Sequence, residues 1–235
     1  MSLHAIIPAR SGSKRFSNKN ITNFLNIPLF YHSIFFAKKL KFVKKIIFSS
    51  DNDKYIKIAK KIPNIIIHKR NIFASRDNSM EEDILFDLKR FYNKEKINFP
   101  KNILWLRPTH PLRSIKTFKK GYNLFKKNKN STLIVHETDS RLFYSKNNLI
   151  YPINNLMKNK SMLRGQDSKP LYKIFSGEFF KFPKKYNKKF LGDKRNFVVA
   201  SKETNFDIDD ELDLKSLQSL IKNSKVKYKN FIHVK

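Results

Sequence analysis

The stretch AIIPARSGSKRFSNKN, residues 5–20, indicates how this chain folds and where a site would lie. Its apolar residues 5–7 are typical of a buried strand, which ends at Pro8. The loop that follows has small residues at its centre and carries the cations Arg10, Lys14, Arg15 and Lys19. Small residues let backbone N–H groups approach anionic oxygens, and cations neutralise the remaining charge. We therefore predict a phosphate-binding loop after a strand. The loop is not a Walker A sequence, and a basic surface loop is the alternative.

Strand-like and helix-like patterns alternate along the next part of the chain. Apolar runs predict strands at 46–50, 65–68, 103–106 and 132–135. Helical spacing predicts helices at 28–40, 53–61, 115–127, and from a capping box at Ser79 and Glu82 to about residue 93. This order predicts an α/β fold with a mainly parallel sheet and helices on both faces.

Ligands in such sheets bind at the carboxyl ends of the strands. Several polar segments lie at or near such ends: the predicted phosphate loop and residues 49–51, 107–113 and 207–209. We expect these segments to meet around one site.

Length and composition limit the class of protein. A chain of 235 residues can bury one sizeable core, so we predict one domain over residues 1–235. The absence of cysteine excludes disulfides and thiolate metal sites. No apolar run approaches the ~20 residues of a membrane span, and the N-terminus leads straight into a strand. We expect a cytoplasmic protein without a signal peptide or membrane association.

The net charge of +31 raises the possibility of a polyanionic partner. The lysines, however, are spread almost evenly along the chain, with no basic tail and no RNA-binding aromatic signature. We interpret the charge as a solvated surface that binds polyanions weakly and without specificity.

Residues 139–185 interrupt the alternation of strands and helices. Their short apolar groups, at 149–151, 172–174 and 179–180, are separated by Asn, Lys and Pro. We predict short strands or hairpins that form an excursion from the main sheet. Short hairpins bury little apolar surface by themselves, so the excursion must pack on the main domain or on a second subunit.

The segment FDIDDELDL, residues 206–214, is an acidic cluster in a chain with 19 Asp and Glu. In extended backbone, Asp207 and Asp209 would point the same way while Ile208 faces the core. Two carboxylates on one face suit Mg²⁺, which accepts one or two carboxylates together with phosphate oxygens and water. The alternative is that these acids serve the following helix, with Asp210 as its N-cap and Asp213 in its first turn.

The first of these segments resembles the N-terminal signature of the cytidylyltransferases that make CMP-activated sialic acids and related nonulosonic acids. The matching positions are Ile7, Pro8, Ala9, Arg10, Gly12, Ser13, Lys14, Lys19 and Asn20. Ser11 stands where a first glycine is common, and residues 16–18 replace a usual Leu/Ile-Pro-Gly. The acidic segment resembles the metal-binding segment of the same family.

Intermediate segments extend the resemblance over nearly the whole chain. Residues 70–77 resemble a family segment at its two ends, Arg70 and Asp77, with Ser79 shortly after. Residues 107–113 resemble a Gln-Pro-Thr-Ser-Pro-Leu-Arg run in which the glutamine that helps hold the sugar is Arg107 here. Residues 164–167 resemble an Arg-Arg-Gln-Asp run, and residues 176–177 stand where Asn-Gly is usual.

The resemblance implies a Rossmann-like nucleotidyltransferase that joins CTP to a sialic-acid-like nine-carbon 2-keto sugar acid, releasing pyrophosphate. It implies a homodimer formed through the excursion. The catalytic residues would be Arg10, Lys14, Lys19 and Asp209. The nucleotide-binding residues would be Arg10, Ser11, Gly12, Ser13, Lys14, Lys19, Asn20, Arg70, Asp77 and Ser79. The sugar-binding residues would be Arg107, Thr109, Arg164 and Gln166. Mg²⁺ would be held by Asp207 and Asp209.

Two other functions remain open. One is a cytidylyltransferase for a 3-deoxy-octulosonate-type or other keto acid, because the Arg107 change affects the expected sugar site. The other is a basic nucleic-acid-binding protein on a degenerate nucleotidyltransferase scaffold. Asp207 and Asp209 argue against that second function, because a binder of polyanions gains nothing from paired carboxylates.

Overall fold

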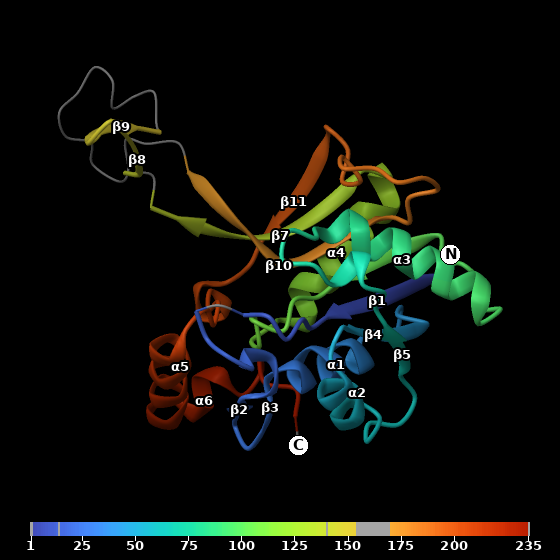
Figure 1. The fold of residues 1–235 in the computed structure, drawn as a ribbon. Helices are drawn as coiled ribbons and strands as arrows, with labels where there is room; N and C mark the ends of the chain where they lie inside the picture. The colour runs from blue at the N-terminus through green and yellow to red at the C-terminus, as the bar shows by residue number, and fades with distance from the viewer. Residues whose placement is uncertain (1, 14, 140, 154–169, 235) are drawn as a thin grey trace.

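The structure, a computed structural model, describes residues 2–13, 15–139, 141–153 and 170–234 (Figure 1). Its centre is a seven-stranded sheet in the order β11-β7-β10-β6-β1-β4-β5. The strands are β1 (Leu3–Pro8), β4 (Lys45–Ser50), β5 (Ile66–Lys69), β6 (Asn102–Trp105), β7 (Ser131–Thr138), β10 (Leu171–Lys181) and β11 (Arg195–Val199). Only β10 runs antiparallel to its neighbours in this sheet, so the predicted mainly parallel sheet is confirmed.

Helices cover both faces of the sheet, as predicted (Figure 1). The α-helices are α1 (Leu29–Lys39), α2 (Asp53–Ala59), α3 (Glu81–Lys94), α4 (Ile115–Asn128), α5 (Glu211–Asn223) and α6 (Lys225–Tyr228). The 3₁₀ turns in the described ranges are η1 (Lys19–Ile21), η2 (Phe73–Ser75) and η5 (Lys202–Thr204). Strand β2 (Asn23–Phe24) pairs with β3 (Ile27–Pro28). No helix in the described part of the chain is long and apolar enough to cross a bilayer.

Side chains of β1 alternate between the two faces of the sheet and so contribute to the apolar core on each face. Ala5 and Ile7 pack in one apolar cluster with residues of α1, α2 and α4. Ile6 points to the opposite face and packs with residues of α3. Because successive side chains of a strand face opposite sides, one short apolar run contributes to both cores. The strand therefore fixes the position of the loop that follows it.

The predicted capping box at Ser79 and Glu82 is wrong. Helix α3 begins at Glu81, and the carboxylate of Asp83 accepts from the backbone N–H of Met80 at 2.8 Å. Ser79 lies in a turn before the helix, where its N–H donates to the carbonyl of Arg76 and its hydroxyl to that of Phe73. These bonds turn Ser79 back toward η2, so it cannot cap α3.

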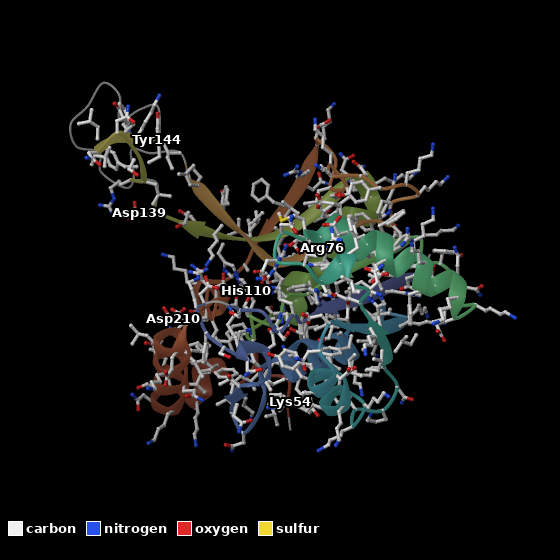
Figure 2. The ribbon with its side chains drawn as sticks, in the orientation of Figure 1. Lys54, Arg76, His110, Asp139, Tyr144 and Asp210 are labelled. Carbon is white, nitrogen blue, oxygen red and sulfur yellow. The ribbon has the colours of Figure 1, made fainter. Side chains whose placement is uncertain are left out.

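Residues 139–185 divide into two parts. Strands β8 (Phe143–Lys146) and β9 (Leu149–Pro152) form a hairpin that stands away from the main sheet (Figure 1). Figure 2 shows Tyr144 on this hairpin, well away from Arg76 and His110 in the body of the protein. Within residues 139–185, the described part that leaves the main sheet is this hairpin.

The second part, β10, belongs to the central sheet, contrary to the prediction of short strands outside it. Phe179 and Phe180 are fully buried in the two cores, so they are not available to a second subunit. The register of β10 against β7 shifts between Lys173 and Gly177. A Cβ at Gly177 would lie 2.6 Å from the ring of Phe118, so glycine allows α4 to pack closely on this strand.

The acidic segment before α5 caps that helix and also turns the side chain of Ile208 into the core. Asp210 caps α5, since its carboxylate accepts from the N–H of Asp213 at 2.9 Å. The carboxylate of Asp213 accepts in return from the N–H groups of Asp209 and Asp210 at 2.8 and 3.1 Å. Ile208 is buried against Leu214 and its neighbours in a third apolar cluster. The predicted cap and the predicted inward side chain are both confirmed.

Candidate functional site

A cleft of about 470 Å³ opens at the carboxyl ends of the strands, where the segment after β1 meets the segments after β5 and β6. The charged side chains that line it are Arg10, Arg15, Lys19, Arg70, Arg76, Glu81 and Arg107. Cations therefore predominate in the cleft, and a polyanionic ligand would be attracted to it.

The loop after β1 is held in place by hydrogen bonds to other segments. The guanidinium of Arg10 donates to the carbonyls of Gly12 at 2.9 Å and Asp77 at 3.3 Å. The side-chain amide of Asn20 donates to the carbonyl of Arg10 at 2.9 Å. These bonds fix Arg10 at the wall of the cleft before any ligand binds, and such preorganisation lowers the cost of binding.

Ser11 and Asp51 form the second attachment of this loop. The backbone N–H and the hydroxyl of Ser11 both donate to the carboxylate of Asp51, at 3.0 and 3.2 Å. Asp51 directly follows β4, so the bond ties together the ends of two neighbouring strands. Ser11 was predicted to bind nucleotide, whereas in this structure both of its donors are used within the protein.

Asp209 is the carboxylate that faces the cations of the loop. Lys19 Nζ lies 2.9 Å from Asp209 Oδ1, and Arg15 Nη2 lies 3.3 Å from Asp209 Oδ2. Both cations line the cleft. The segment before α5 therefore closes one edge of the cleft through its carboxylate.

Asp207 has a different set of partners. Lys173 Nζ lies 3.1 Å from Asp207 Oδ2, and His110 Nδ1 lies 3.5 Å from Asp207 Oδ1. Burial lowers the pKa of His110 to about 3, so the ring is neutral near pH 7 and the charge of Asp207 is balanced by Lys173. The N–H of Ile208 donates to the carbonyl of Thr109 at 2.9 Å, which fixes this segment beside the loop after β6.

Arg70 follows β5 and is buried, with 7% of its surface exposed. Its Nε donates to the hydroxyl of Ser49 at 3.0 Å and its Nη2 to the carbonyl of Ser49 at 3.1 Å. Burial lowers the pKa of Arg70 to about 10, so it stays protonated at neutral pH. Behind Ser49, His68 links the hydroxyl to Asp87, with distances of 3.0 and 3.2 Å. This chain of contacts holds the guanidinium in one position.

Arg107 lies at the other side of the cleft between two carboxylates. Its Nη1 lies 2.7 Å from Glu178 Oε1, and its Nη2 lies 2.8 Å from Glu81 Oε1. Arg113, which is fully buried, supports the backbone here by donating to the carbonyl of Arg107 at 2.6 Å. Burial lowers the pKa of Arg113 to about 9, which leaves it charged at neutral pH.

Comparison with known proteins decides the family. Residues 4–154 match the profile of a family described as cytidylyltransferase. The chain belongs to the cytidylyltransferase family. It is 31% identical over 231 residues to a Campylobacter jejuni protein named CMP-N,N'-diacetyllegionaminic acid synthase, covering 96% of this chain and 97% of that one. It is 29% identical over 239 residues to a Campylobacter coli protein named post-translational flagellin modification protein B, covering 96% and 97%.

The fold of this cytidylyltransferase is also found in a solved structure of CMP:2-keto-3-deoxy-manno-octonic acid synthetase complexed with CTP. The TM-score is 0.64, with 95% of this chain and all of that chain covered. The two sequences are 13% identical, so the likeness establishes the shared fold alone.

The cleft of this cytidylyltransferase brings together many of the predicted site residues. Those that line it are Arg10, Ser13, Lys19, Asn20, Arg70, Ser79, Arg107 and Thr109. Gly12 and Asp77 lie beside it, where a Cβ on Gly12 would be 3.6 Å from Asp77 Oδ1. Asp209 contacts two of its cations. Lys14, Arg164 and Gln166 lie outside the described residues.

Several residues that position the site were not predicted from the sequence. They are Arg76 and Glu81 in the cleft, and His68, Asp87 and Glu178 around it. Residues 49–51 were expected near the site from their position at a strand end, and Ser49 and Asp51 do contact its residues. Glu178 gave no signal, because its strand was not expected in the central sheet.

Proposed function

We propose that this cytidylyltransferase joins the CMP unit of CTP to a sialic-acid-like nine-carbon 2-keto sugar acid and releases pyrophosphate. Sialic, legionaminic and pseudaminic acids are the acceptor class. The observation that carries the proposal is the cationic cleft, in which Arg10, Arg15, Lys19, Arg70 and Arg76 surround a space for a triphosphate. The relative named as a legionaminic acid synthase, similar over nearly its full length, supports the acceptor class.

The reaction would be an attack of the anomeric hydroxyl on the α-phosphorus of CTP. The O–P bond to the sugar forms as the bond to pyrophosphate breaks, and the hydroxyl proton is released. Phosphoryl transfer of this kind needs alignment and charge neutralisation more than covalent chemistry from the protein. In our proposal Arg10, Lys19 and Arg15 hold the phosphates, while Asn20 and Arg70 contact the nucleoside side.

The preorganised cations would act most strongly on the leaving pyrophosphate. Arg10 is already fixed by its bonds to backbone carbonyls, so it needs little rearrangement when charge develops. The buried Arg70 loses little further hydration on contact with the ligand, and its hydrogen bonds to Ser49 fix its direction. The site would therefore bind the transition state better than a flexible set of lysines could.

The carboxylates of Asp207 and Asp209 suit Mg²⁺ in their donor chemistry. Both supply carboxylate oxygens; Asp209 contacts two cations of the proposed phosphate site, whereas Asp207 lines a separate pocket together with Lys173. The described part of the chain has no cluster of three or more His, Cys, Asp or Glu side chains arranged to hold a metal ion. Phosphate oxygens and water would therefore have to complete the ligand set around the two carboxylates. Magnesium held there would polarise the α-phosphate.

We also propose that the protein is a homodimer that pairs through the β8–β9 hairpin. The hairpin exposes Phe143, Tyr144, Leu149, Ile150 and Tyr151. A two-stranded hairpin is marginal in water by itself, so apolar side chains on both of its strands favour burial against another surface. A second copy of the same hairpin offers a complementary apolar surface in a two-fold arrangement.

Pyrophosphate release tests the proposed reaction. The purified protein would be incubated with CTP, Mg²⁺ and each of three nine-carbon acids, and with an eight-carbon 3-deoxy-octulosonate as the competing acceptor. We expect release with at least one nine-carbon acid and much less with the eight-carbon acid. Release with the eight-carbon acid alone would favour the other cytidylyltransferase reaction, and no release with any acid would refute both.

A further inference from the structure

Three buried polar side chains form a row behind the cleft. Ser49 and His68 are register partners on β4 and β5, and Ser49 Oγ lies 3.0 Å from His68 Nδ1. His68 Nε2 in turn lies 3.2 Å from Oδ2 of Asp87, a buried carboxylate on α3. None of the three lines the cleft, so any effect of this Ser49–His68–Asp87 row on a ligand must pass through another residue.

The residue at the cleft end of the row is Arg70. Hydrolases also place a serine, a histidine and an aspartate at such distances, with the hydroxyl as nucleophile. Here the hydroxyl of Ser49 is fully buried, and Arg70 Nε donates to it at 3.0 Å. A substrate cannot reach this oxygen, so the row has no nucleophile. Arg70 itself lines the cleft and connects the row to it.

The hydrogen bonds along the row have one consistent direction. A guanidinium can only donate, so Ser49 Oγ accepts from Arg70. Within the described part of the chain, the hydroxyl proton of Ser49 then has His68 Nδ1 as its acceptor. Burial lowers the pKa of His68, so the ring is neutral near pH 7 and carries its proton on Nε2, beside the carboxylate of Asp87. Asp87 thus stabilises the tautomer that Ser49 requires.

Ser49 fixes one edge of the Arg70 guanidinium with two acceptors. Arg70 Nε donates to the hydroxyl, and Arg70 Nη2 donates to the carbonyl at 3.1 Å. No hydrogen bond among the described residues uses Nη1 of Arg70, which leaves that atom for a ligand in the cleft. Loss of the hydroxyl, or of its acceptor on His68, would weaken the hold on the guanidinium.

Asp87 also fixes the chain directly after Arg70. Its Oδ2 accepts from the backbone N–H of Asn71 at 2.9 Å. The side-chain oxygen of Asn71 accepts from the N–H of Ala74 at 2.9 Å, and Ala74 lines the cleft. One carboxylate on α3 therefore holds both the row and the turn that follows Arg70.

We propose that His68 and Asp87 are positioning residues for the nucleoside part of CTP. They act through Ser49, whose hydroxyl orients Arg70 at the cleft. The inference rests on the proposed function, in which Arg70 contacts the nucleoside side, and adds to it two residues that touch no ligand. The alternative is that the row only stabilises the fold, and in that case its loss would not affect the nucleoside selectively.

The test compares CTP with inorganic triphosphate, which has the phosphates but no nucleoside. Calorimetric titration with Mg²⁺ would give both dissociation constants for the wild type, Ser49→Ala, His68→Phe and His68→Asn. Phenylalanine keeps a ring against Phe91 but has no acceptor, whereas asparagine can place an oxygen near the position of Nδ1. Tyr92→Phe is the matched control, because it removes a buried hydrogen bond to another histidine, His4, and neither residue lines the cleft.

Ser49→Ala and His68→Phe should bind CTP about threefold to tenfold more weakly, which is the range for loss of one hydrogen bond, and should bind triphosphate as the wild type does. His68→Asn should keep most of the affinity for CTP, and Asp87→Asn should lose part of it. Tyr92→Phe should bind both ligands as the wild type does. Thermal melts would show which variants are folded, and Ser49→Ala decides if His68→Phe is not.

Four results would overturn the inference while leaving the proposed reaction intact. They are an unchanged affinity for CTP in folded Ser49→Ala, an equal loss for CTP and triphosphate, a loss in His68→Asn as large as in His68→Phe, and an equal loss in Tyr92→Phe. Arg70→Lys should show the same loss for CTP alone, and an unchanged affinity there would remove the nucleoside contact on which the inference depends. A wild type that does not bind CTP would overturn the proposed function itself.

Discussion

Lys19 and Asp209 form an ion pair with 2.9 Å between Nζ and Oδ1, although 190 residues separate them in the chain. The side chain of Lys19 is 11% exposed and that of Asp209 is 39% exposed. The pair joins the loop after β1 to the segment before α5 at the edge of the cleft. A bound triphosphate with its metal would compete for both partners, so the two residues are the most direct probes of the proposed reaction.

Replacing Asp209 with asparagine should abolish most of the CTP turnover. The variant loses one anionic ligand for Mg²⁺ while keeping the shape of the side chain, and we expect a loss of about 10²-fold or more in kcat. Pyrophosphate release at saturating Mg²⁺ measures it. Asp210→Asn is the matched control, because asparagine also caps helices well. Near wild-type turnover in Asp209→Asn would exclude a metal role for this carboxylate.

Lys19→Ala should weaken the handling of CTP without unfolding the protein. Loss of a charge-assisted contact to phosphate costs about 1.5–3 kcal/mol, so kcat/KM for CTP should fall at least tenfold. Steady-state kinetics and thermal melts of the variant would be compared with those of Lys41→Ala, an exposed lysine remote from the cleft. If activity falls only in proportion to a large loss of melting temperature, Lys19 has a structural role instead.

The β8–β9 hairpin should control the oligomeric state. Ile150 is 69% exposed, so Ile150→Asp should leave the fold intact while placing a charge on the proposed dimer contact. Light scattering at moderate salt should give a dimer for the wild type and a monomer for this variant. Val226→Asp, at a residue 90% exposed on α6, is the control and should remain dimeric. A monomeric and fully active wild type would contradict the proposed dimer.

Buried histidines should make the protein less stable as the pH falls below about 6.5. Burial lowers the pKa of His4 and of His32 to about 4, so both are neutral in the fold and protonate more readily when unfolded. Between pH 6.5 and 4 the unfolded state therefore binds more protons. Each group then removes about 1.4 kcal/mol of stability per pH unit.

Urea denaturation at pH 7.5, 6 and 5 measures this effect. In His32→Gln the slope of the free energy of unfolding against pH should decrease by about one proton in this window. An unchanged slope would mean that His32 does not contribute to the acid sensitivity.

Local patterns predicted much of the fold and part of the site. The apolar run before Pro8, the helical spacing of α1 and α4, and the cap at Asp210 depend on neighbours in sequence, and all are present. Arg10, Lys19 and Asn20 were predicted to lie together for the same reason, because one short loop carries them.

Contacts between distant segments could not be predicted in this way. Arg107 and Glu178 are 71 residues apart, and their contact depends on β10 being inserted antiparallel between β6 and β7. The sequence of β10 was interpreted as short strands because Ser176 and Gly177 separate its two apolar groups, and the register against β7 shifts in the same region, between Lys173 and Gly177. Arg107 was expected at the sugar site because of its place in the run that resembles the family's, and the two carboxylates beside its guanidinium are brought there only by the tertiary fold.

The most direct test of the proposed activity is to identify the product. CTP and a nine-carbon 2-keto sugar acid would be incubated with the protein and Mg²⁺, and the products followed by ³¹P NMR and mass spectrometry. We predict a new phosphodiester with the mass of the CMP-sugar, formed in equal amount with pyrophosphate. Unchanged CTP with every nine-carbon acid tried, or CMP released without a sugar attached, would contradict the account.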